Sequence, residues 1–535
     1  MTEFAQRLTP GLLLFQLLAP WIAAIVLSFP RFRVDRKTEW LVFLVHLLLA
    51  VSGLVLAGCV LFLSHSESVT VTVPIEFVVP LGNVSSTSSL LSHLVWELDS
   101  PAAFWMCLIP WIAISAQIFS TEMIATSSQI TGHLWLTASL NLFIAAGDVG
   151  SLAVGAGATI LFLAARIAWF GGDDKRNTAV QFLMLQLSGL MLMVAGLGLF
   201  VASASLIRSA PFGPPRPSSF SFPELESFLQ TAITNHPAAE QLWGEYRVLP
   251  SALMLLGIMM MAAGFPMQVW LSESSASAAL GERLWQLAWV KGVLFTGLRL
   301  LAALDPEALH SFGWWGLIIS IPGAIFVSSL LFSQAYLSRM QSSCLAWTQQ
   351  LGLIAAFTAT QHLELWLVPL LFSQLAGMVL FTVALTTISE RYRSVEMASF
   401  QGLSARAGWL LPVLATCMIT FTLTPLGIGL IQGWLVSTTL QGTESLAGTL
   451  LRGGYFLANL LALGGLVRIT HQLCTGPLRL PEMAPGLRER TQLPASIVTL
   501  QLSRGQLILL AAWGVLAVVM AVSGPIFYLS VNPNF

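Results

Sequence analysis

The sequence predicts an all-α polytopic membrane protein with about fourteen transmembrane helices, two of which are broken. Of its 535 residues, 56% are apolar and only 9% are charged, whereas a soluble domain carries about 25% charged residues. Apolar runs long enough to cross a bilayer, roughly 20 residues each, recur along the whole chain. A β-barrel would instead show short segments of alternating polarity. The net charge of −1 excludes the basic footprint of a nucleic-acid-binding protein.

The expected spans follow one another from end to end of the chain. They cover residues 9–29, 39–64, 103–121, 127–147, 149–170, 178–206, 249–271, 284–304, 311–335, 344–360, 364–388, 407–438, 450–470 and 505–530. Three of the polar segments between them are long, namely 65–98, 207–248 and 471–503. The short turn that contains Asp148 is expected to leave this carboxylate in solvent.

Lysine and arginine determine the expected orientation, because positive residues of short loops stay on the inner side of a membrane. Of the 24 Lys and Arg residues, seventeen fall on one side, Arg166 and Arg283 among them, and five on the other. The remaining two, Lys291 and Arg299, lie within a span. Both termini and the first two long polar segments should therefore face the outer, periplasmic side of a cell inner membrane. The third long polar segment should face inward.

Two of the expected spans are interrupted. The first continues into "FPMQVWLSESSASAAL" (265–280), where Pro266 removes a helical hydrogen bond. The second contains "ITFTLTPLGIGLIQGWLV" (419–436), with Pro425 and three glycines. If spans four to eight form one group of five and spans nine to thirteen another, each break lies in the fourth span of its group. Paired interrupted helices at matching positions are typical of a transport path between two repeats, and an odd number of spans per repeat makes the repeats inverted.

The same grouping divides the chain into four parts. They are 1–126 with helices one to three and the outer loop 65–98, 127–304 with the first five-helix repeat and the outer loop 207–248, 311–470 with the second five-helix repeat, and 471–535 with an inner loop and the C-terminal transmembrane helix.

The sequence predicts no catalytic site, cofactor or metal in this chain. The five cysteines are scattered, form no CxxC pair and are typical of small core residues. No P-loop, HExxH or GxSxG pattern occurs. His46, His133 and His362 are isolated in or near spans, and we expect them to be satisfied polar core groups rather than ligands. Any enzymatic activity of an assembly would then lie in other subunits.

Two cations lie within the eighth expected span and are the candidate ion-translocation residues. A lysine in mid-membrane costs about 2.5–3.5 kcal/mol on insertion scales, so Lys291 should face the bundle interior or water. Desolvation and its like-charged neighbours Arg283 and Arg299 favour the neutral amine, which could relay a proton. The alternative is a structural lysine that snorkels or caps a broken helix. Arg299, eight residues later, also has the character of a structural partner or an interface anchor.

Four segments match the order and spacing of one known family. They are "WELDSPAAFWMCLIPWIAISAQIFSTE" (96–122), "PMQVWLSESSASAAL…LAWVKGVLFTGLRL" (266–300), "SSCLAWTQQLGLIAAF" (342–357) and "FQGLSARAGWLLPVLATCMITFTLTPLGIG" (400–429). Over about residues 95–440 the chain resembles the proton-conducting, antiporter-like subunits of respiratory complex I, membrane hydrogenases, Mrp antiporters and DAB inorganic-carbon pumps. The resemblance implies that Asp99 is the structural acid of the third helix and that Lys291 is the lysine of the eighth.

Most charged positions of that family are neutral in this chain. The family glutamate of the fifth helix falls near Gly157, and the lysine of the seventh falls near Met261. Charged positions of the eleventh and twelfth helices fall near Ser373, Gly377 and Gln432. Lys291, with Arg299 two turns later, alone keeps a charge at such a position.

The resemblance implies an antiporter-like subunit that translocates an ion, expected to be the proton, within a multi-subunit energy-coupling complex. It implies other membrane subunits and the lipid bilayer as partners, with a soluble partner on the inner face. Two alternatives stay open. One is the membrane subunit of a DAB-type inorganic-carbon uptake pump, whose partner is a zinc carbonic-anhydrase-like protein. The other is a non-conducting scaffold that kept the fold and lost the charged residues.

Overall fold

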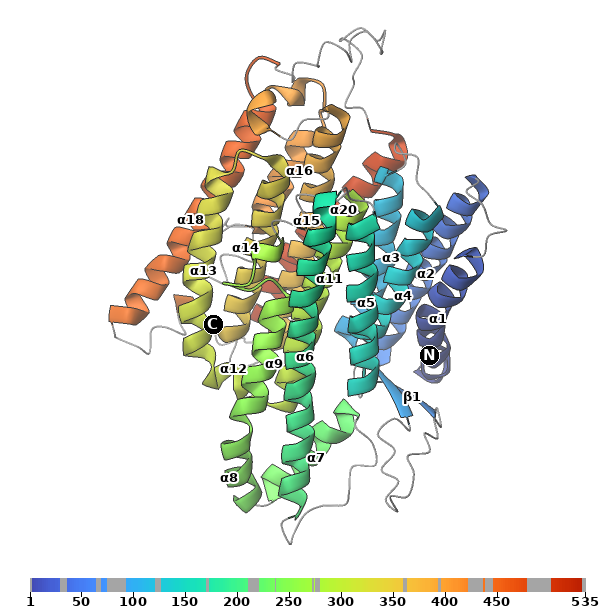
Figure 1. The fold of residues 1–535 in the computed structure, drawn as a ribbon, viewed down its shortest axis with the longest axis vertical. Coiled ribbons are helices and arrows are strands. Elements are labelled where there is room, and N and C mark those ends of the chain that lie inside the picture. Colours follow the sequence, from blue (N-terminus) through green and yellow to red (C-terminus); the bar gives the residue numbers. More distant parts are fainter. Residues whose placement is uncertain are drawn as a thin grey trace. The chain divides into compact units, whose positions relative to one another are not determined.

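Long helices make up nearly all of the described chain (Figure 1). The computed structural model describes residues 2–28, 36–63, 69–74, 93–120, 127–169, 173–209, 221–235, 237–271, 274, 280–358, 363–392, 396–421, 436–437, 446–478 and 502–531. Within these residues, ten helices are long and apolar enough to cross a membrane, and two shorter apolar helices accompany them. The chain is therefore a multi-pass helical membrane protein.

The chain divides into two compact units. Unit 1 comprises Met1–Ala262 with Ala288–Ala308, and unit 2 comprises Ala263–Leu287 with Leu309–Phe535. The helices of unit 1 are α1 (Thr2–Ser28), α2 (Arg36–Leu63), α3 (Ser100–Ser120), α4 (Ser127–Ile144), α5 (Val149–Trp169), α6 (Asp173–Ser209), α7 (Phe222–Asn235), α8 (Pro237–Tyr246), α9 (Val248–Met261) and most of α11 (Leu280–Leu304).

Unit 2 contains the beginning of α11 and the helices that follow it. They are α13 (Gly313–Ser333), α14 (Leu337–Thr358), α15 (Leu363–Tyr392), α16 (Leu410–Phe421), α18 (Leu446–Cys474) and α20 (Arg504–Val531), with the short helices η1 (Met397–Ser399) and η2 (Leu403–Ala405). The four-residue α12 (Ala308–Ser311) precedes α13. These helices lie at places where the sequence predicts spans, because a chain in lipid must satisfy its backbone groups within the segment.

The seventh expected span is interrupted where the sequence breaks its pattern. α9 ends at Met261, and Ala263 adopts a left-handed backbone conformation with φ 55°. A tight turn follows, in which the amide of Met267 donates to the carbonyl of Gly264 at 2.7 Å. Pro266 lies within this turn and has no N–H to continue a helix. In the twelfth expected span α16 ends at Phe421, and Pro425 lies outside the described residues.

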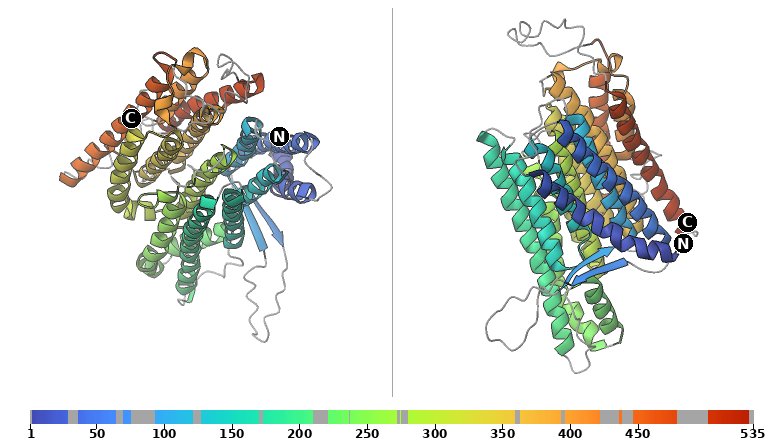
Figure 2. Two further views of the ribbon diagram at one scale, coloured as in Figure 1. Left: turned by 45° about the horizontal axis from the view of Figure 1, so that its top comes forward. Right: turned by 90° about the vertical axis from the view of Figure 1, so that its right-hand side faces the viewer.

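The long polar segments contain structure that the sequence analysis did not predict. Strand β1 (Val69–Pro74) pairs antiparallel with strand β2 (His93–Leu98), and the two run side by side (Figure 2). The all-α prediction is therefore corrected by two short strands. Their alternating "VTVTVP" and "HLVWEL" patterns carry the period of two that is typical of strands. The segment 207–248 contains α7 and α8 rather than loop alone.

Small residues bring the unit 1 helices close together. A Cβ on Gly257 of α9 would lie 2.5 Å from the carbonyl oxygen of Gly189 in α6, and these helices lie side by side in Figure 1. Gly155 of α5 lies equally close to the backbone of Phe143 in α4. Gly297 of α11 contacts Ile258 of α9. Glycine permits this approach because it carries no side chain, as is common between membrane helices.

In unit 2, glycines likewise allow close packing of α13 against α14 and of α15 against α16. Gly316 lies against the ring of Phe357, whose helix runs antiparallel to α13. Gly377 of α15 contacts Thr420 and Phe421 of α16. The contacts of Gly377 leave no room for a larger side chain at this position of α15.

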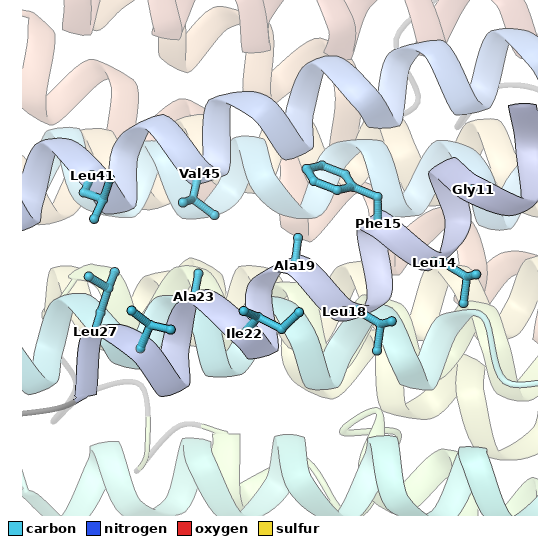
Figure 3. Close-up of a pocket in the computed structure, with 11 residues that line it drawn as sticks. Gly11, Leu14, Phe15, Leu18, Ala19, Ile22, Ala23, Leu27, Leu41 and Val45 are labelled. Atoms are coloured by element: carbon cyan, nitrogen blue, oxygen red, sulfur yellow. The ribbon is translucent and has the colours of Figure 1, made fainter. Parts of the chain in front are cut away.

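An apolar groove runs along α1 and α2 (Figure 3). It has a volume of ≈ 570 Å³ and is lined among others by Leu18, Ile22 and Val45. Ile22 is 59% exposed, and many other apolar side chains on these two helices are exposed as well. Such a surface is expected where a protein meets lipid chains or another membrane helix.

Candidate ion-translocation site

Lys291 lies in the interior of unit 1. Its side chain is completely buried, with 0% exposure, in the middle third of α11. The next residue, Gly292, faces Leu140 and Ile144 of α4. Trp289 packs against Phe143 of α4 with ring centroids 5.2 Å apart. The complete burial of the lysine fits a group that faces the bundle interior rather than lipid headgroups.

A short polar chain connects this helix to the break in α9. The indole N–H of Trp289 donates to Oε1 of Gln186 at 2.8 Å. The side-chain amide of Gln186 in turn donates to the carbonyl oxygen of Met261, the last residue of α9, at 3.4 Å. Both side chains are fully buried. The position where the resemblance expects a lysine, Met261, thus carries a buried carbonyl at the end of a helix, and a neutral amide satisfies it.

Asp99 and Arg299 form an ion pair. The guanidinium of Arg299 lies 3.1 Å from one carboxylate oxygen of Asp99 and 3.2 Å from the other. The same carboxylate accepts from the amide of Ala102 at 2.7 Å and so caps the beginning of α3. The side chains are 13% and 25% exposed. Two residues 200 positions apart thus join α3 to α11 on the side of Lys291 toward the end of α11.

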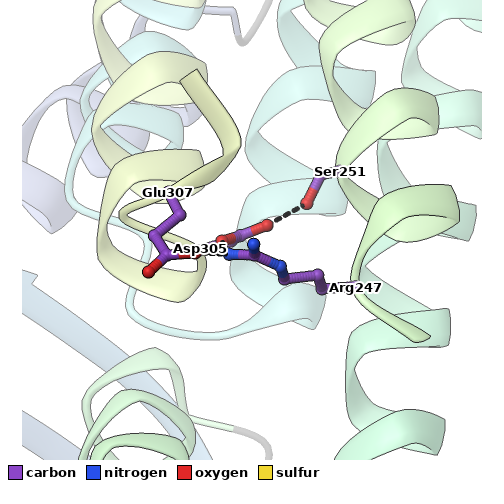
Figure 4. A network of polar contacts seen from close by, with 4 residues as sticks. All are labelled: Arg247, Ser251, Asp305 and Glu307. Carbon is purple, nitrogen blue, oxygen red and sulfur yellow. Dashed lines mark hydrogen bonds and ion pairs between the residues drawn. The ribbon is translucent and has the colours of Figure 1, made fainter. Parts of the chain in front are cut away.

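A second charged network lies where α11 ends (Figure 4). Asp305, 2% exposed, accepts from Arg247 at 3.1 Å and from the hydroxyl of Ser251 at 2.7 Å. Arg247 also pairs with Glu307, which is 72% exposed. Burial raises the pKa of Asp305 above its usual value, although Ser251 and Arg247 oppose this shift. This network joins the beginning of α9 to the end of α11.

Two histidines that are isolated in the sequence come together in unit 1. Nε2 of His46 in α2 lies 3.1 Å from the hydroxyl of Thr137 in α4, and that hydroxyl donates to the carbonyl of His133 at 2.9 Å. The guanidinium of Arg166 in α5 lies directly against Gly132, the neighbour of His133. All these side chains are buried. The assignment of Arg166 to an inner loop is therefore wrong, because the residue lies inside a helix.

Arg283 is likewise a buried residue rather than a loop residue. It lies in the first turn of α11, within unit 2, with 9% exposure. Its guanidinium donates to Oε1 of Gln341 in α14 at 3.0 Å and to Thr386 in α15 at 3.2 Å.

The expectation that Asp148 lies in solvent is also wrong. This residue is 6% exposed, and its carboxylate caps α5 by accepting from the amide of Ser151 at 2.8 Å.

The positions where charge is missing are occupied by packing contacts. Ser373 donates to the carbonyl of Ala517 in α20 at 3.2 Å. The carbonyl of Gly377 accepts from the thiol of Cys417 at 3.3 Å. A Cβ on Gly157 of α5 would lie 4.0 Å from Leu190, its one neighbour among the described residues. Gln432 lies outside these residues. Within the described part of the chain, no three His, Cys, Asp or Glu residues are grouped so as to hold a metal.

Comparison with known proteins identifies the fold. No protein-family model matches the sequence, and no curated protein matches it either. Among solved structures, a chain of the membrane-bound sulfane sulfur reductase, an archaeal respiratory membrane complex, superposes with a TM-score of 0.71 at 15% identity over 95% of this chain and 76% of that one.

Two further complexes contain chains of the same fold. A chain of the Mrp complex from Dietzia sp. gives a TM-score of 0.69 at 13% identity, covering 98% of this chain and 95% of that one. A chain of respiratory complex I from Thermus thermophilus, solved with bound NADH, gives 0.68 at 16% identity over 94% of this chain and 99% of that one. The fold expected from the resemblance, that of an antiporter-like membrane subunit, is therefore confirmed.

Proposed function

We propose that this chain, which has the fold of an antiporter-like membrane subunit, translocates protons as one subunit of a multi-subunit energy-coupling complex. The observation that carries the proposal is the complete burial of Lys291 in the middle of α11. Intramembrane ionisable groups of this kind are typical of ion and proton pathways.

Arg299 has a different role in this proposal. Its ion pair with Asp99 holds α11 against the beginning of α3, so Arg299 anchors the helix that carries Lys291. An arginine also keeps its proton at all physiological pH values and is a poor relay. The proposed division of labour is therefore one relay residue and one charged anchor on a single helix.

The repeat organisation belongs to the same proposal. We infer about fourteen spans, with spans four to eight and nine to thirteen as inverted repeats within 127–304 and 311–470. The turn after α9 supports the first break, since its helix ends five residues before Pro266. Half-helices at matching positions would supply backbone groups to the translocated ion.

We further propose that the termini face the outer side of the cell membrane. Removing the buried Arg166 and Arg283 from the loop count leaves the positive side unchanged, since it retains most of the Lys and Arg residues. Single cysteines engineered near position 220 and near position 480 test this orientation in intact cells. An impermeant label should reach the first and not the second, and the reverse pattern would invert the topology.

Other membrane subunits are the expected partners. The three structures of this fold come from multi-subunit membrane complexes, and the apolar groove on α1 and α2 offers a surface for one neighbour. A soluble partner on the inner face also stays a proposal. No feature of the described residues favours inorganic-carbon uptake over the other functions. The neutral residues at Ser373 and Gly377 favour the non-conducting scaffold as the second candidate.

Proton flux through the purified complex, reconstituted in vesicles, tests the proposal. The chain is expected to co-purify in mild detergent with at least one other membrane subunit. The complex should then dissipate or build a pH gradient when its coupled reaction or counter-ion gradient is supplied. An intact complex that moves no protons, with sealed vesicles verified by a control ionophore, would support the scaffold instead.

A further inference from the structure

Five buried polar side chains of unit 2 belong to the turn that follows α9 and to the helices α13 and α14. This amide cluster consists of Gln268 in the turn, Ser320 in α13, and Trp347, Gln349 and Gln350 in α14. Gln268 is 8% exposed, and Ser320, Trp347, Gln349 and Gln350 are all fully buried. None of these residues is charged, and none belongs to the lysine site in unit 1.

The packing of Gly323 brings the turn and α14 together against α13. A Cβ on Gly323 of α13 would lie 3.2 Å from Oε1 of Gln350 and closer still to Phe265. Phe265 also packs on Phe326 with ring centroids 5.9 Å apart, so the turn lies against α13. Ser320 is one helical turn from Gly323 on the same face of α13. Gln268 follows Phe265 by three residues in the turn.

The polar atoms of the cluster have no hydrogen-bond partner among the described residues. These atoms are both side-chain atoms of Gln349, both of Gln350, Oε1 of Gln268, Oγ of Ser320 and the indole nitrogen of Trp347. Nearby hydroxyls behave differently, since Thr348 donates to the carbonyl of Leu345 at 2.8 Å. Buried polar groups in proteins are almost always hydrogen-bonded, so something other than the described side chains must satisfy these atoms.

The mixture of donors and acceptors indicates the kind of bound group that satisfies these atoms. The cluster presents amide and indole N–H groups together with amide oxygens and one hydroxyl. An alkali cation takes oxygen ligands and would leave every N–H unsatisfied. An anion would leave the carbonyl oxygens unsatisfied. Water donates and accepts equally, and buried water molecules typically make about three hydrogen bonds to such groups.

The absence of charged residues from most of α13 and α14 also favours water over an ion. α13 contains no Asp, Glu, Lys, Arg or His, and α14 contains none after Arg339. A desolvated ion beside these helices would therefore have no counter-charge from them. We propose that the amide cluster binds a small group of occluded water molecules. Building on the proposed proton translocation, this water carries protons through unit 2, where the charged positions of the family are neutral.

Radiolytic oxidation in the purified, reconstituted protein tests for this water. X-rays convert bound water into hydroxyl radicals that oxidise the adjacent side chain before they diffuse away. The reporter is Trp347, and the matched control is Trp289, which is equally buried but donates to Gln186. Trp347 is expected to be oxidised about tenfold faster than Trp289, toward the rate of an exposed tryptophan. Equal rates at the two tryptophans would overturn the proposal.

Two variants locate the water. In the Gln349→Leu/Gln350→Leu protein, Trp347 should be oxidised as slowly as Trp289, because leucine binds no water. Thr348→Val, whose hydroxyl already bonds to its own helix, should keep the wild-type rate. Fast oxidation that survives the double substitution would overturn the assignment to these amides. If the double variant does not accumulate, the ratio of Trp347 to Trp289 in the wild-type protein still decides.

Proton flux in the same vesicles separates this inference from the proposed function. Fast oxidation of Trp347 without any flux would support the occluded water and count against translocation. Flux with slow oxidation would leave translocation standing and overturn the occluded water.

Discussion

Replacing Lys291 by methionine is expected to reduce proton flux by about tenfold or more while the protein still assembles. Methionine keeps the length of the side chain and removes its ionisable amine. The lysine is fully buried in α11, so the substitution replaces a buried ionisable group by an apolar one of similar length. Flux is measured as dissipation of a pH gradient in vesicles, and assembly is measured by size-exclusion chromatography of the purified complex.

The Lys291→Arg variant separates a relay from a fixed charge. Arginine keeps the positive charge but does not release its proton in proteins. A relay role predicts that Lys291→Arg loses flux as Lys291→Met does. A role as fixed charge predicts that arginine keeps the flux. Unchanged flux in Lys291→Met would refute the relay, and failure of both variants to assemble would make Lys291 a structural residue.

Replacing Arg247 by methionine is expected to destabilise the protein by about 3–5 kcal/mol, because it leaves a buried carboxylate without its ion-pair partner. The carboxylate is that of Asp305, which is 2% exposed and keeps only its hydrogen bond from Ser251. The matched control is Glu307→Gln. Glu307 pairs with the same arginine but is 72% exposed, and exposed pairs contribute about 1 kcal/mol or less. The midpoint of thermal unfolding in detergent measures both.

The pH dependence of this loss has a defined sign. The pKa of Asp305 is higher in the folded protein than in the unfolded chain. At pH values between these two pKa values, the folded state therefore binds more protons than the unfolded state. The contribution of Asp305 to stability therefore falls as pH rises through its folded pKa. Arg247 opposes this shift, so its removal should cost more at about pH 8 than at about pH 5.

A second substitution at the same network provides the counter-test. Asp305→Asn in the Arg247→Met background removes the stranded charge and should restore most of the stability. It should also abolish the pH dependence. A double variant as unstable as Arg247→Met alone would mean that the arginine acts by packing rather than by charge.

The sequence by itself determined that this is a helical, multi-pass membrane protein and where its long apolar helices lie. Apolar runs specify helices in a membrane because lipid offers no hydrogen-bond partner to the backbone, so every such run must satisfy its own groups. The end of α9 before Pro266 was predictable for the same local reason, since proline has no N–H to continue the helix. The alternating patterns of β1 and β2 also indicate strands, within the segment 65–98 that its polar composition alone would make a loop.

Only the tertiary structure decided which polar groups meet. Asp99 and Arg299 are 200 positions apart, and Gln186 reaches both Trp289 and the end of α9. Such partners depend on how helices rotate and cross, which small residues such as Gly155 and Gly257 set through contact with the backbone of a neighbouring helix. A helical sequence specifies which residues share a face, but the neighbour of that face comes from packing with distant segments. For this reason the sequence singled out Lys291, whereas the structure revealed its anchor and the amide cluster.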